Sequence, residues 1–243
     1  MARDHGKKYA EALKKVDRAQ LYAPQDAVAL IKSTSYTKFD ATVEVHLRLG
    51  IDPRHADQNI RTTVALPHGT GKSVRVLVFA QGEAAQAAKD AGADFVGADD
   101  LIGRIDKENF FDFDIAIATP DMMGKVGRVG RKLGPRGLMP NPKSGTIVQP
   151  EDLPRTIREV RGGRVEFRND RTGLLHVAVG KVSFSEGQIQ DNIAALMDAV
   201  KAAKPAATKG VFVKSVTFTS TMGPGIRVDP VAAQAMSVGS AAE

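Results

Sequence analysis

A strand pattern close to the C-terminus constrains the fold of this chain more than any other feature. Val211–Val228 (VFVKSVTFTSTMGPGIRV) alternates imperfectly between polar residues and β-branched or aromatic ones, which is typical of a half-buried strand. Glycine and proline in Thr221–Gly225 then favour a turn. A strand this late needs a partner, and Thr42–Gly50 (TVEVHLRLG) is the best candidate. We therefore expect the two halves of the chain to share one sheet.

The same alternation predicts that this sheet is antiparallel and that one of its faces is exposed to solvent. Along Thr42–Gly50 the polar residues on the solvent-exposed face would be Thr42, Glu44, His46 and Arg48. Arg61–Leu66 is a candidate neighbouring strand. Asn169–Gly173 is expected to form a hairpin turn between strands Arg164–Arg168 and Leu174–Val179. The Ala/Ser-rich C-terminal end is expected to fray.

The middle of the chain has a different character. Apolar runs predict buried strands at Val74–Ala80, Asp94–Val96 and Asp114–Ala118, and helical patterns separate them. This order is typical of a parallel sheet with helices outside. We therefore predict an α+β discontinuous domain, an antiparallel sheet with packed helices, from residues 1–67 and 159–243. Residues 68–158 would form an inserted α/β domain.

Charge and composition narrow the class of partner. The net charge is +6, and residues 68–158 contribute 13 Lys/Arg and 12 Asp/Glu, so most of the excess lies in the outer segments. Such basicity favours a polyanion such as RNA, although a mildly basic surface without a partner is the alternative. Tryptophan is absent and aromatic residues are 5%, which argues against stacking of unpaired bases. Folded, shaped nucleic acid fits better.

Other features concern the compartment and the membrane. The chain has no cysteine, no signal-peptide pattern and no apolar run of the roughly 18 residues that a membrane helix needs. We therefore expect a soluble cytoplasmic protein without disulfides and without a membrane partner.

The sequence offers no catalytic or metal-binding set. The five histidines lack metal-ligand spacing, and no cysteine could join them. Gly69–Ser73 (GTGKS) resembles a phosphate-binding loop, but Leu66 stands where that loop needs glycine, and a strand follows where a helix should. We therefore expect no enzyme, no cofactor and no metal. A nucleotide-binding enzyme using the α/β segment is the disfavoured alternative.

One candidate contact for nucleic acid lies in the inserted segment. No acidic residue occurs from Met122 through Gln149, and the Gly/Pro-rich stretch within it is basic. It could contact phosphates, or it could be a solvated face that balances nearby acidic helices. The residues concerned are Lys125, Arg128, Arg131, Lys132, Arg136 and Lys143.

A second candidate combines polar residues of the outer strands. Hydroxyls and carboxylates can read ribose 2′-hydroxyls, while an apolar side chain packs on a ribose or base. If the strands pair as expected, these residues could converge at one end of the sheet; ordinary sheet edges and turns are the alternative. The set comprises Lys38, Phe39, Thr42, Glu44, Arg168, Asp170, Arg171, Ser215, Thr221, Met222 and Gly223.

Four motifs resemble one known family, that of bacterial large-subunit ribosomal protein one. They are KFDATVEVH at Lys38–His46, LGPRGLMPNPK at Leu133–Lys143, FRND at Phe167–Asp170 and TMGP at Thr221–Pro224. The likeness covers nearly the whole chain in order and spacing. Arg171 stands where a lysine is common in the family. This difference keeps the positive charge but changes the geometry of the hydrogen bonds that the side chain can donate.

The resemblance implies a fold and a function. The discontinuous domain would hold large-subunit ribosomal RNA, and the inserted domain would be Rossmann-like without a nucleotide. The protein would form the mobile stalk of the cytoplasmic ribosome and assist release of deacylated tRNA from the exit site. It would also repress translation by binding the mRNA leader of its own operon. Carried over by motif, the RNA-contacting residues would be Phe39, Thr42, Glu44, Arg168, Asp170, Ser215, Thr221, Met222 and Gly223.

Overall fold

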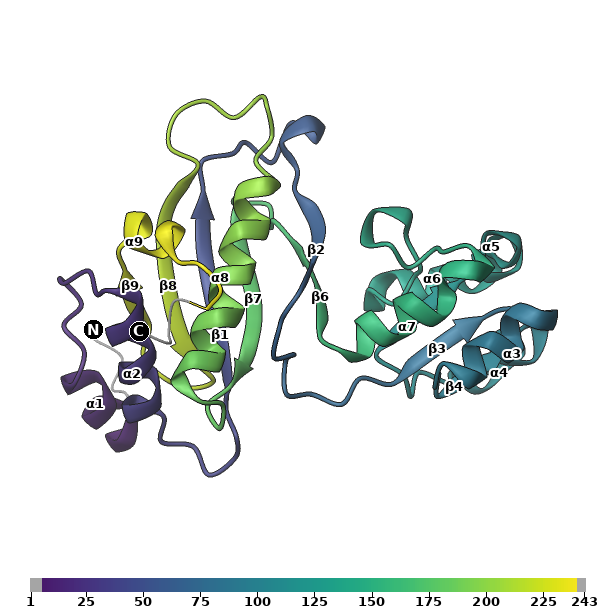
Figure 1. Ribbon diagram of the computed structural model, residues 1–243, viewed down its shortest axis with the longest axis horizontal. Coiled ribbons are helices and arrows are strands. Elements are labelled where there is room, and N and C mark those ends of the chain that lie inside the picture. Colours follow the sequence, from purple (N-terminus) through teal and green to yellow (C-terminus); the bar gives the residue numbers. More distant parts are fainter. Residues whose placement is uncertain (1–5, 240–243) are drawn as a thin grey trace. The chain divides into compact units, whose positions relative to one another are not determined.

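The computed structural model describes residues 6–239, which divide into two compact units (Figure 1). The first unit contains the described residues up to Gly71 and those from Val165 onward, and the second is Lys72–Arg164. The boundary expected after Arg158 falls inside helix α7 (Leu153–Arg161). The apolar face of α7 is buried in a core of the second unit, so the whole helix belongs to that unit.

The first unit is built on a four-stranded sheet of order β7-β1-β8-β9. The strands are β1 (Thr42–Leu49), β7 (Leu174–Lys181), β8 (Val213–Ser220) and β9 (Ile226–Val228), and each pairs antiparallel with its neighbours. The expected pairing of the early strand with the late one is therefore confirmed. Strict alternation of buried and accessible residues along β1 gives the sheet one apolar and one polar face.

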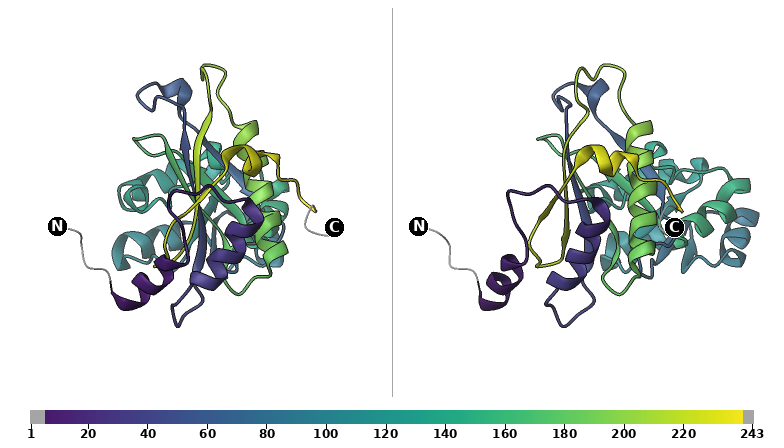
Figure 2. Two further views of the ribbon diagram at one scale, coloured as in Figure 1. Left: turned by 90° about the vertical axis from the view of Figure 1, so that its left-hand side faces the viewer. Right: turned by 60° about the vertical axis from the view of Figure 1, so that its left-hand side comes forward.

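Helices cover the apolar face of this sheet, as the edge-on view in Figure 2 (left) shows. They are α2 (Pro24–Thr34), α8 (Glu186–Ala202) and α9 (Pro230–Ala235). Helix α8 begins with the expected capping box, in which Ser185 and Gln188 bond to each other's backbone. Buried Ala233 packs α9 against the core. The expected fraying of the C-terminal end stays a prediction, and residues 240–243 lie outside the described part. Helix α1 (Lys7–Lys14) precedes α2.

Two expected strand pairings are wrong. Strand β2 (Arg61–Ala65) does not join β1; it forms a separate two-stranded sheet with β6 (Arg164–Arg168). Both edges of β1 are already occupied by β7 and β8, so no position is left for β2. The turn at Asn169–Gly173 consequently links strands of different sheets and is not a hairpin.

The second unit contains a three-stranded parallel sheet of order β4-β3-β5, as the sequence pattern predicts. All four residues of β3 are buried, and separate apolar clusters pack on the sheet. The strands are β3 (Val76–Phe79), β4 (Phe95–Gly97) and β5 (Ile115–Ala118). Besides α7, the main helices are α3 (Gly82–Asp90) and α4 (Asp99–Glu108).

A run of short helical turns follows β5. Its glycines keep it from forming one long regular helix, but buried Val126, Val129 and Leu133 hold it on the core. Its elements are η2 (Pro120–Met122), α5 (Met123–Val126), η3 (Gly127–Val129), α6 (Gly130–Leu133) and η4 (Gly134–Arg136). Three further 3-10 turns are η1 (Ala56–Gln58), η5 (Pro142–Ser144) and η6 (Pro150–Asp152).

Candidate nucleic-acid interface

The polar face of the four-stranded sheet, opposite its helices, is called the open face below. Residues that point to the same side meet across neighbouring strands, because side chains alternate with a period of two. The register pairs Glu44 with Thr219, His46 with His176 and Arg48 with Ser215. Hydroxyls, imidazoles and charges therefore form one surface that crosses three strands.

At one end of the open face, Thr42 and Thr221 lock two strand ends together. The Thr221 N–H donates to the Thr42 carbonyl at 2.9 Å, and the Thr42 N–H donates to Thr221 Oγ1 at 3.1 Å. Lys181 Nζ donates to Thr42 Oγ1 at 2.9 Å from the other neighbouring strand. Both threonine hydroxyls therefore already have partners within the protein, and they fix the shape of this end.

The turn after Thr221 presents Met222 to solvent. Met222 has a left-handed φ of 68° and an exposed fraction of 66%. The Tyr36 hydroxyl donates to the Met222 carbonyl at 2.6 Å, and the Gly223 N–H donates to the Ser220 carbonyl at 2.7 Å. A non-glycine residue in this region costs roughly 1–3 kcal/mol and recurs at functional sites. Phe39, on the loop that leads into β1 at the same end, is 58% exposed.

The other end of the open face is organised by Asp170. Asp170 Oδ1 accepts the N–H groups of Thr172 and Leu174, each at 2.8 Å, and these bonds hold the turn into β7. The Leu174 N–H is the main reason that the pKa of Asp170 lies below its ordinary value, so the carboxylate is ionised at neutral pH. Asp170 Oδ2 lies 4.0 Å from His176 Nε2.

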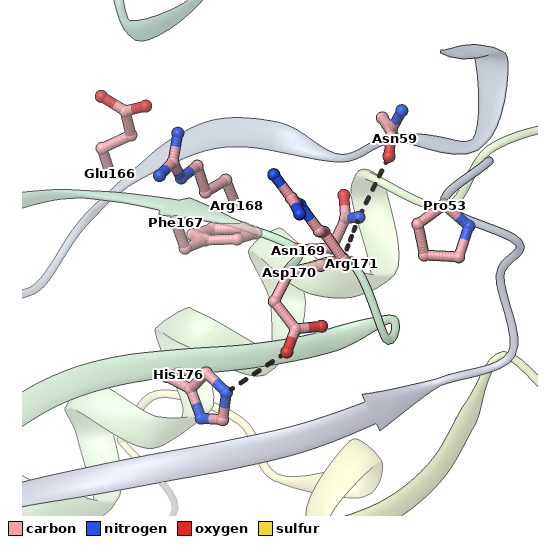
Figure 3. Close-up of a pocket in the computed structure, with 9 residues that line it drawn as sticks. All are labelled: Pro53, Asn59, Glu166, Phe167, Arg168, Asn169, Asp170, Arg171 and His176. Carbon is pink, nitrogen blue, oxygen red and sulfur yellow. Dashed lines mark hydrogen bonds and ion pairs between the residues drawn. The ribbon is translucent and has the colours of Figure 1, made fainter. Parts of the chain in front are cut away.

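A cavity of about 720 Å³ lies beside this turn (Figure 3). Exposed Arg168 and Arg171 supply positive charge at its wall. Pro53, Asn59, Glu166, Phe167, Asn169 and His176 also line it, together with Asp170. Donors, acceptors and charges of both signs therefore surround a space large enough for a nucleotide-sized group.

The hypothesis that all these residues converge at one sheet end is wrong. Thr42, Thr221, Met222 and Gly223 meet at one end, with Lys38 and Phe39 on the adjoining loop, and Glu44 lies along β1. Arg168, Asp170, Arg171 and Ser215 lie near the other end. The separation along β1 is roughly 20 Å, given a rise of about 3.3 Å per residue. Because β1 and β7 are antiparallel, the turn before β7 must lie at the far end from Thr42.

Sequence reasoning missed three side chains that shape this surface: Tyr36, Lys181 and His176. Each acts across a strand or turn contact, so only a register would have revealed it. His46 Nδ1 lies 2.8 Å from His176 Nδ1. The pKa of His46 lies below its ordinary value because of its burial and the repulsion of His176, which Glu44 partly opposes.

The basic stretch in the second unit is only partly free. Lys125 pairs with Asp99 at 2.7 Å and Lys132 with Asp106 at 3.2 Å, so α4 neutralises these two lysines. The Arg136 guanidinium lies over the Phe111 ring at 3.7 Å. Among the described residues, the exposed cations without an ion pair in this stretch are Arg128, Arg131, Arg136 and Lys143.

The glycine-lysine loop has no phosphate-binding geometry. Gly69 and Gly71 have left-handed φ values of 67° and 70°, no helix follows the loop, and Lys72 Nζ bonds to Asp114 at 2.6 Å. Within residues 6–239, no three His, Asp or Glu side chains are grouped as a metal site. No helix of that part is long and apolar enough to cross a membrane.

Comparison with known proteins identifies relatives over most of the chain. The model of the ribosomal protein L1p/L10e family matches residues 31–224. The large ribosomal subunit protein uL1 of Chloroflexus aurantiacus is 78% identical over 230 residues, which cover 95% of this chain and 97% of that protein. Its counterpart in Chloroflexus aggregans is 77% identical over 230 residues, with the same coverage of both chains. These relatives are named as ribosomal proteins and not as enzymes.

Proposed function

The chain belongs to the ribosomal protein L1p/L10e family, and on that premise we propose that it is a non-enzymatic protein of the large ribosomal subunit that holds ribosomal RNA on its first unit. The observation that carries this proposal is the Thr42–Thr221 end of the open face. There a strained, exposed Met222 and an exposed Phe39 accompany strand ends whose backbone is fixed. Rigid, preorganised features of this kind suit recognition of one RNA shape.

The chemistry of the open face supports RNA as the ligand. Hydroxyl and carboxylate oxygens, such as those of Ser215 and Glu44, can bond ribose 2′-hydroxyls, which distinguish RNA from DNA. Exposed Arg168, Arg171 and Lys38 can contact phosphates, which positions the RNA without reading its sequence. We therefore assign rRNA binding to both ends. At one end, Lys38, Phe39, Glu44, Met222 and Gly223 would contact the RNA on a shape that Thr42 and Thr221 hold, and at the other end Arg168, Asp170, Arg171 and Ser215 would contact it.

For the second unit we propose a supporting contact. Its Rossmann-like arrangement would bind no nucleotide, since its glycine loop lacks the required geometry. The free cations Arg128, Arg131 and Lys143 suit a phosphate backbone, such as that of exit-site tRNA or a flanking part of the ribosomal RNA. Lys125 and Lys132 would then act mainly by holding the stretch on α4.

The wider role that we propose is that of a mobile stalk on the cytoplasmic ribosome. A hinge at Gly69–Gly71 and Gly162–Gly163 would let the two units change their relation while tRNA leaves. The protein would also repress its own operon, because a leader mRNA that copies the shape of the ribosomal site could occupy the same open face.

A footprint of the full-length protein on large-subunit ribosomal RNA and on its leader mRNA tests this proposal. We expect protection of one structured region in each RNA, with loss of both footprints in a Met222→Gly/Phe39→Ala variant. Equal protection throughout the RNA, or footprints that survive this double substitution while Arg128→Ala/Arg131→Ala removes them, would contradict the assignment to the open face.

A further inference from the structure

Four titratable side chains form a row across the open face, with Glu44 and Asp170 at its ends and His46 and His176 between them. His46 Nε2 lies 3.6 Å from Glu44 Oε2, the two imidazole Nδ1 atoms of His46 and His176 lie 2.8 Å apart, and His176 Nε2 lies 4.0 Å from Asp170 Oδ2. Figure 3 shows the Asp170 end of this row. The proposed function leaves the two central histidines without a role.

The short contact between the rings restricts where protons can lie. One Nδ1 must donate and the other must accept, so the bond itself holds one proton. A further proton would give a pair with one positive charge, in which both Nε2–H groups face a carboxylate. In the free protein, burial and the neighbouring ring lower the pKa of His46, which favours the pair without the further proton.

Charges of both signs surround the pair. The carboxylates are Glu44 on β1 and Asp170 on the turn before β7. The neighbouring elements also carry cations: Arg48 on β1, Arg168 on β6, Lys181 on β7, Lys214 on β8, Arg227 on β9, Arg171 on the turn before β7 and Arg18 between α1 and α2. The helices lie behind the opposite face. The two carboxylates therefore make the histidine pair less attractive to phosphate than the exposed cations Lys38, Arg168 and Arg171, unless the pair gains a proton.

We propose that a phosphodiester of the bound RNA crosses the open face at His46 and His176, and that binding captures one proton on this pair. This inference rests on the proposed function. The phosphate field favours the charged pair, and the charged pair offsets the repulsion by Glu44 and Asp170. The contact would join the two ends of the site, roughly 20 Å apart along a strand rising about 3.3 Å per residue, into one binding surface.

Calorimetry on the unaltered full-length protein tests this directly. The probe is a transcript of the large-subunit RNA region that the footprint identifies, titrated at about pH 7 in two buffers that differ in ionisation enthalpy. We expect net uptake of up to about one proton per complex. The Kd should fall as the pH is lowered from about 8 to about 6, by at most about tenfold per pH unit for one proton.

The variant His46→Gln/His176→Gln isolates the pair, because glutamine can hydrogen-bond but cannot be protonated in this range. We expect proton uptake to disappear and the affinity at low pH to fall to its high-pH level. The matched control is His68→Gln, since His68 bonds Asp191 on α8, away from the open face, at 3.0 Å. That control should keep the full proton uptake.

The possible outcomes separate the inference from the function. Tight binding of the wild-type protein without proton uptake would overturn the inference and leave the proposed function standing, as would unchanged uptake in the double variant. Absence of any specific binding would overturn both. Since the calorimetric measurement needs no substitution, a folding defect in the variant cannot decide the question.

Discussion

At the scale of single residues, Thr221 contributes by holding backbone. Its hydroxyl accepts the Thr42 N–H and lies 3.3 Å from the Thr42 carbonyl, so it is occupied within the protein. The residue presented to a partner is its neighbour Met222. Contact with RNA at this end therefore depends on a geometry that Thr221 maintains.

Thr221→Ala should weaken specific RNA binding by about 1–3 kcal/mol, because the Thr42 N–H loses its acceptor and the end of β1 loosens. The dependence of affinity on salt should hardly change, since no phosphate contact is removed. Filter binding over a range of salt concentrations measures both quantities.

Thr221→Ser is the matched control, because it keeps the hydroxyl and should retain most of the affinity. A loss in Thr221→Ala that appears only as a smaller salt dependence would show that Thr221 acts through phosphate contact instead.

Gly223→Ala should distort the turn that presents Met222. An added Cβ would overlap Ser220 Oγ and lie 3.1 Å from the Ser220 carbonyl oxygen, so the buried Ser220 side chain must rotate and the turn must adjust. We expect a lower Tm and at least about a tenfold loss of RNA affinity, equivalent to about 1.4 kcal/mol. Thermal unfolding and binding measured on the same preparation check this.

Gly103→Ala serves as the control for adding a methyl group. Gly103 lies within α4, and a Cβ there meets nothing within 4 Å. This substitution should raise stability by up to about 1 kcal/mol through helix propensity. Equal destabilisation by both substitutions would remove the steric explanation for Gly223.

At the scale of elements, Asp114 joins the segment before β3 to β5. It accepts a bond from Lys72 Nζ at 2.6 Å and from the Arg75 N–H at 3.1 Å. The bond from Lys72 is the largest cause of a pKa below the ordinary value, with burial acting in the opposite direction. The parallel sheet is thus fastened at one end by an ionised carboxylate.

Asp114→Asn should make the unfolding of the second unit less dependent on pH. A carboxyl group whose folded-state pKa is lowered stabilises the fold above its unfolded pKa of about 3.9, and this contribution disappears as the pH falls through the folded-state value. Because Lys72 is mostly exposed, we expect about 1 kcal/mol or less. Urea unfolding between about pH 6 and pH 3 measures it.

Asp112→Asn is the control, since Asp112 is more exposed than Asp114 and bonds only the Arg75 side chain among the contacts described. Asp112→Asn should change the free energy of unfolding less than Asp114→Asn does. We expect the free energy of unfolding of the wild-type protein to decline more steeply at low pH than that of Asp114→Asn. An equal decline in both proteins would contradict the proposed role of Asp114.

The run of helical turns after β5 carries its own prediction. Arg128→Ala/Arg131→Ala should lower affinity for nonspecific RNA and reduce the slope of log K against log salt by about 0.7–0.9 per lost phosphate contact. The matched variant Lys125→Ala/Lys132→Ala removes cations that are already paired with α4, so its slope should change less. Identical slopes in both variants would exclude the proposed contact.

At the scale of the whole molecule, each unit has its own core. The largest apolar cluster draws only on residues before Gly71 and after Val165, and two smaller clusters belong to the second unit. A unit with a separate core can fold by itself.

We therefore expect residues 1–71 and 165–243, joined by a short glycine linker, to fold and to bind the ribosomal RNA site nearly as tightly as the whole protein. Circular dichroism checks folding, and filter binding checks affinity. If the isolated second unit retains the specific binding and the joined first unit does not, the assignment of RNA contact is reversed.

Local patterns predicted most of the elements. Alternation in Thr42–Leu49 and Val213–Ser220 predicted their pairing, because two half-buried strands must bury matching apolar faces. The pattern of Arg61–Ala65 predicted a strand but not its partner, since alternation describes a face and not a neighbour. Residue types and expected strand pairing gave the candidate residues, and the resemblance supported most of them. Their split between two sheet ends follows from strand direction.

The sequence by itself determined which residues form strands and helices, where the character of the chain changes, and which motifs link it to its family. These depend on local periodicity and on residue types. Only the tertiary structure decided that Thr42 and Thr221 meet, that Asp170 lies at the far end of β1, and that His46 and His176 share a bond. Strand order and register decide such contacts, and they depend on the packing of segments far apart in the chain.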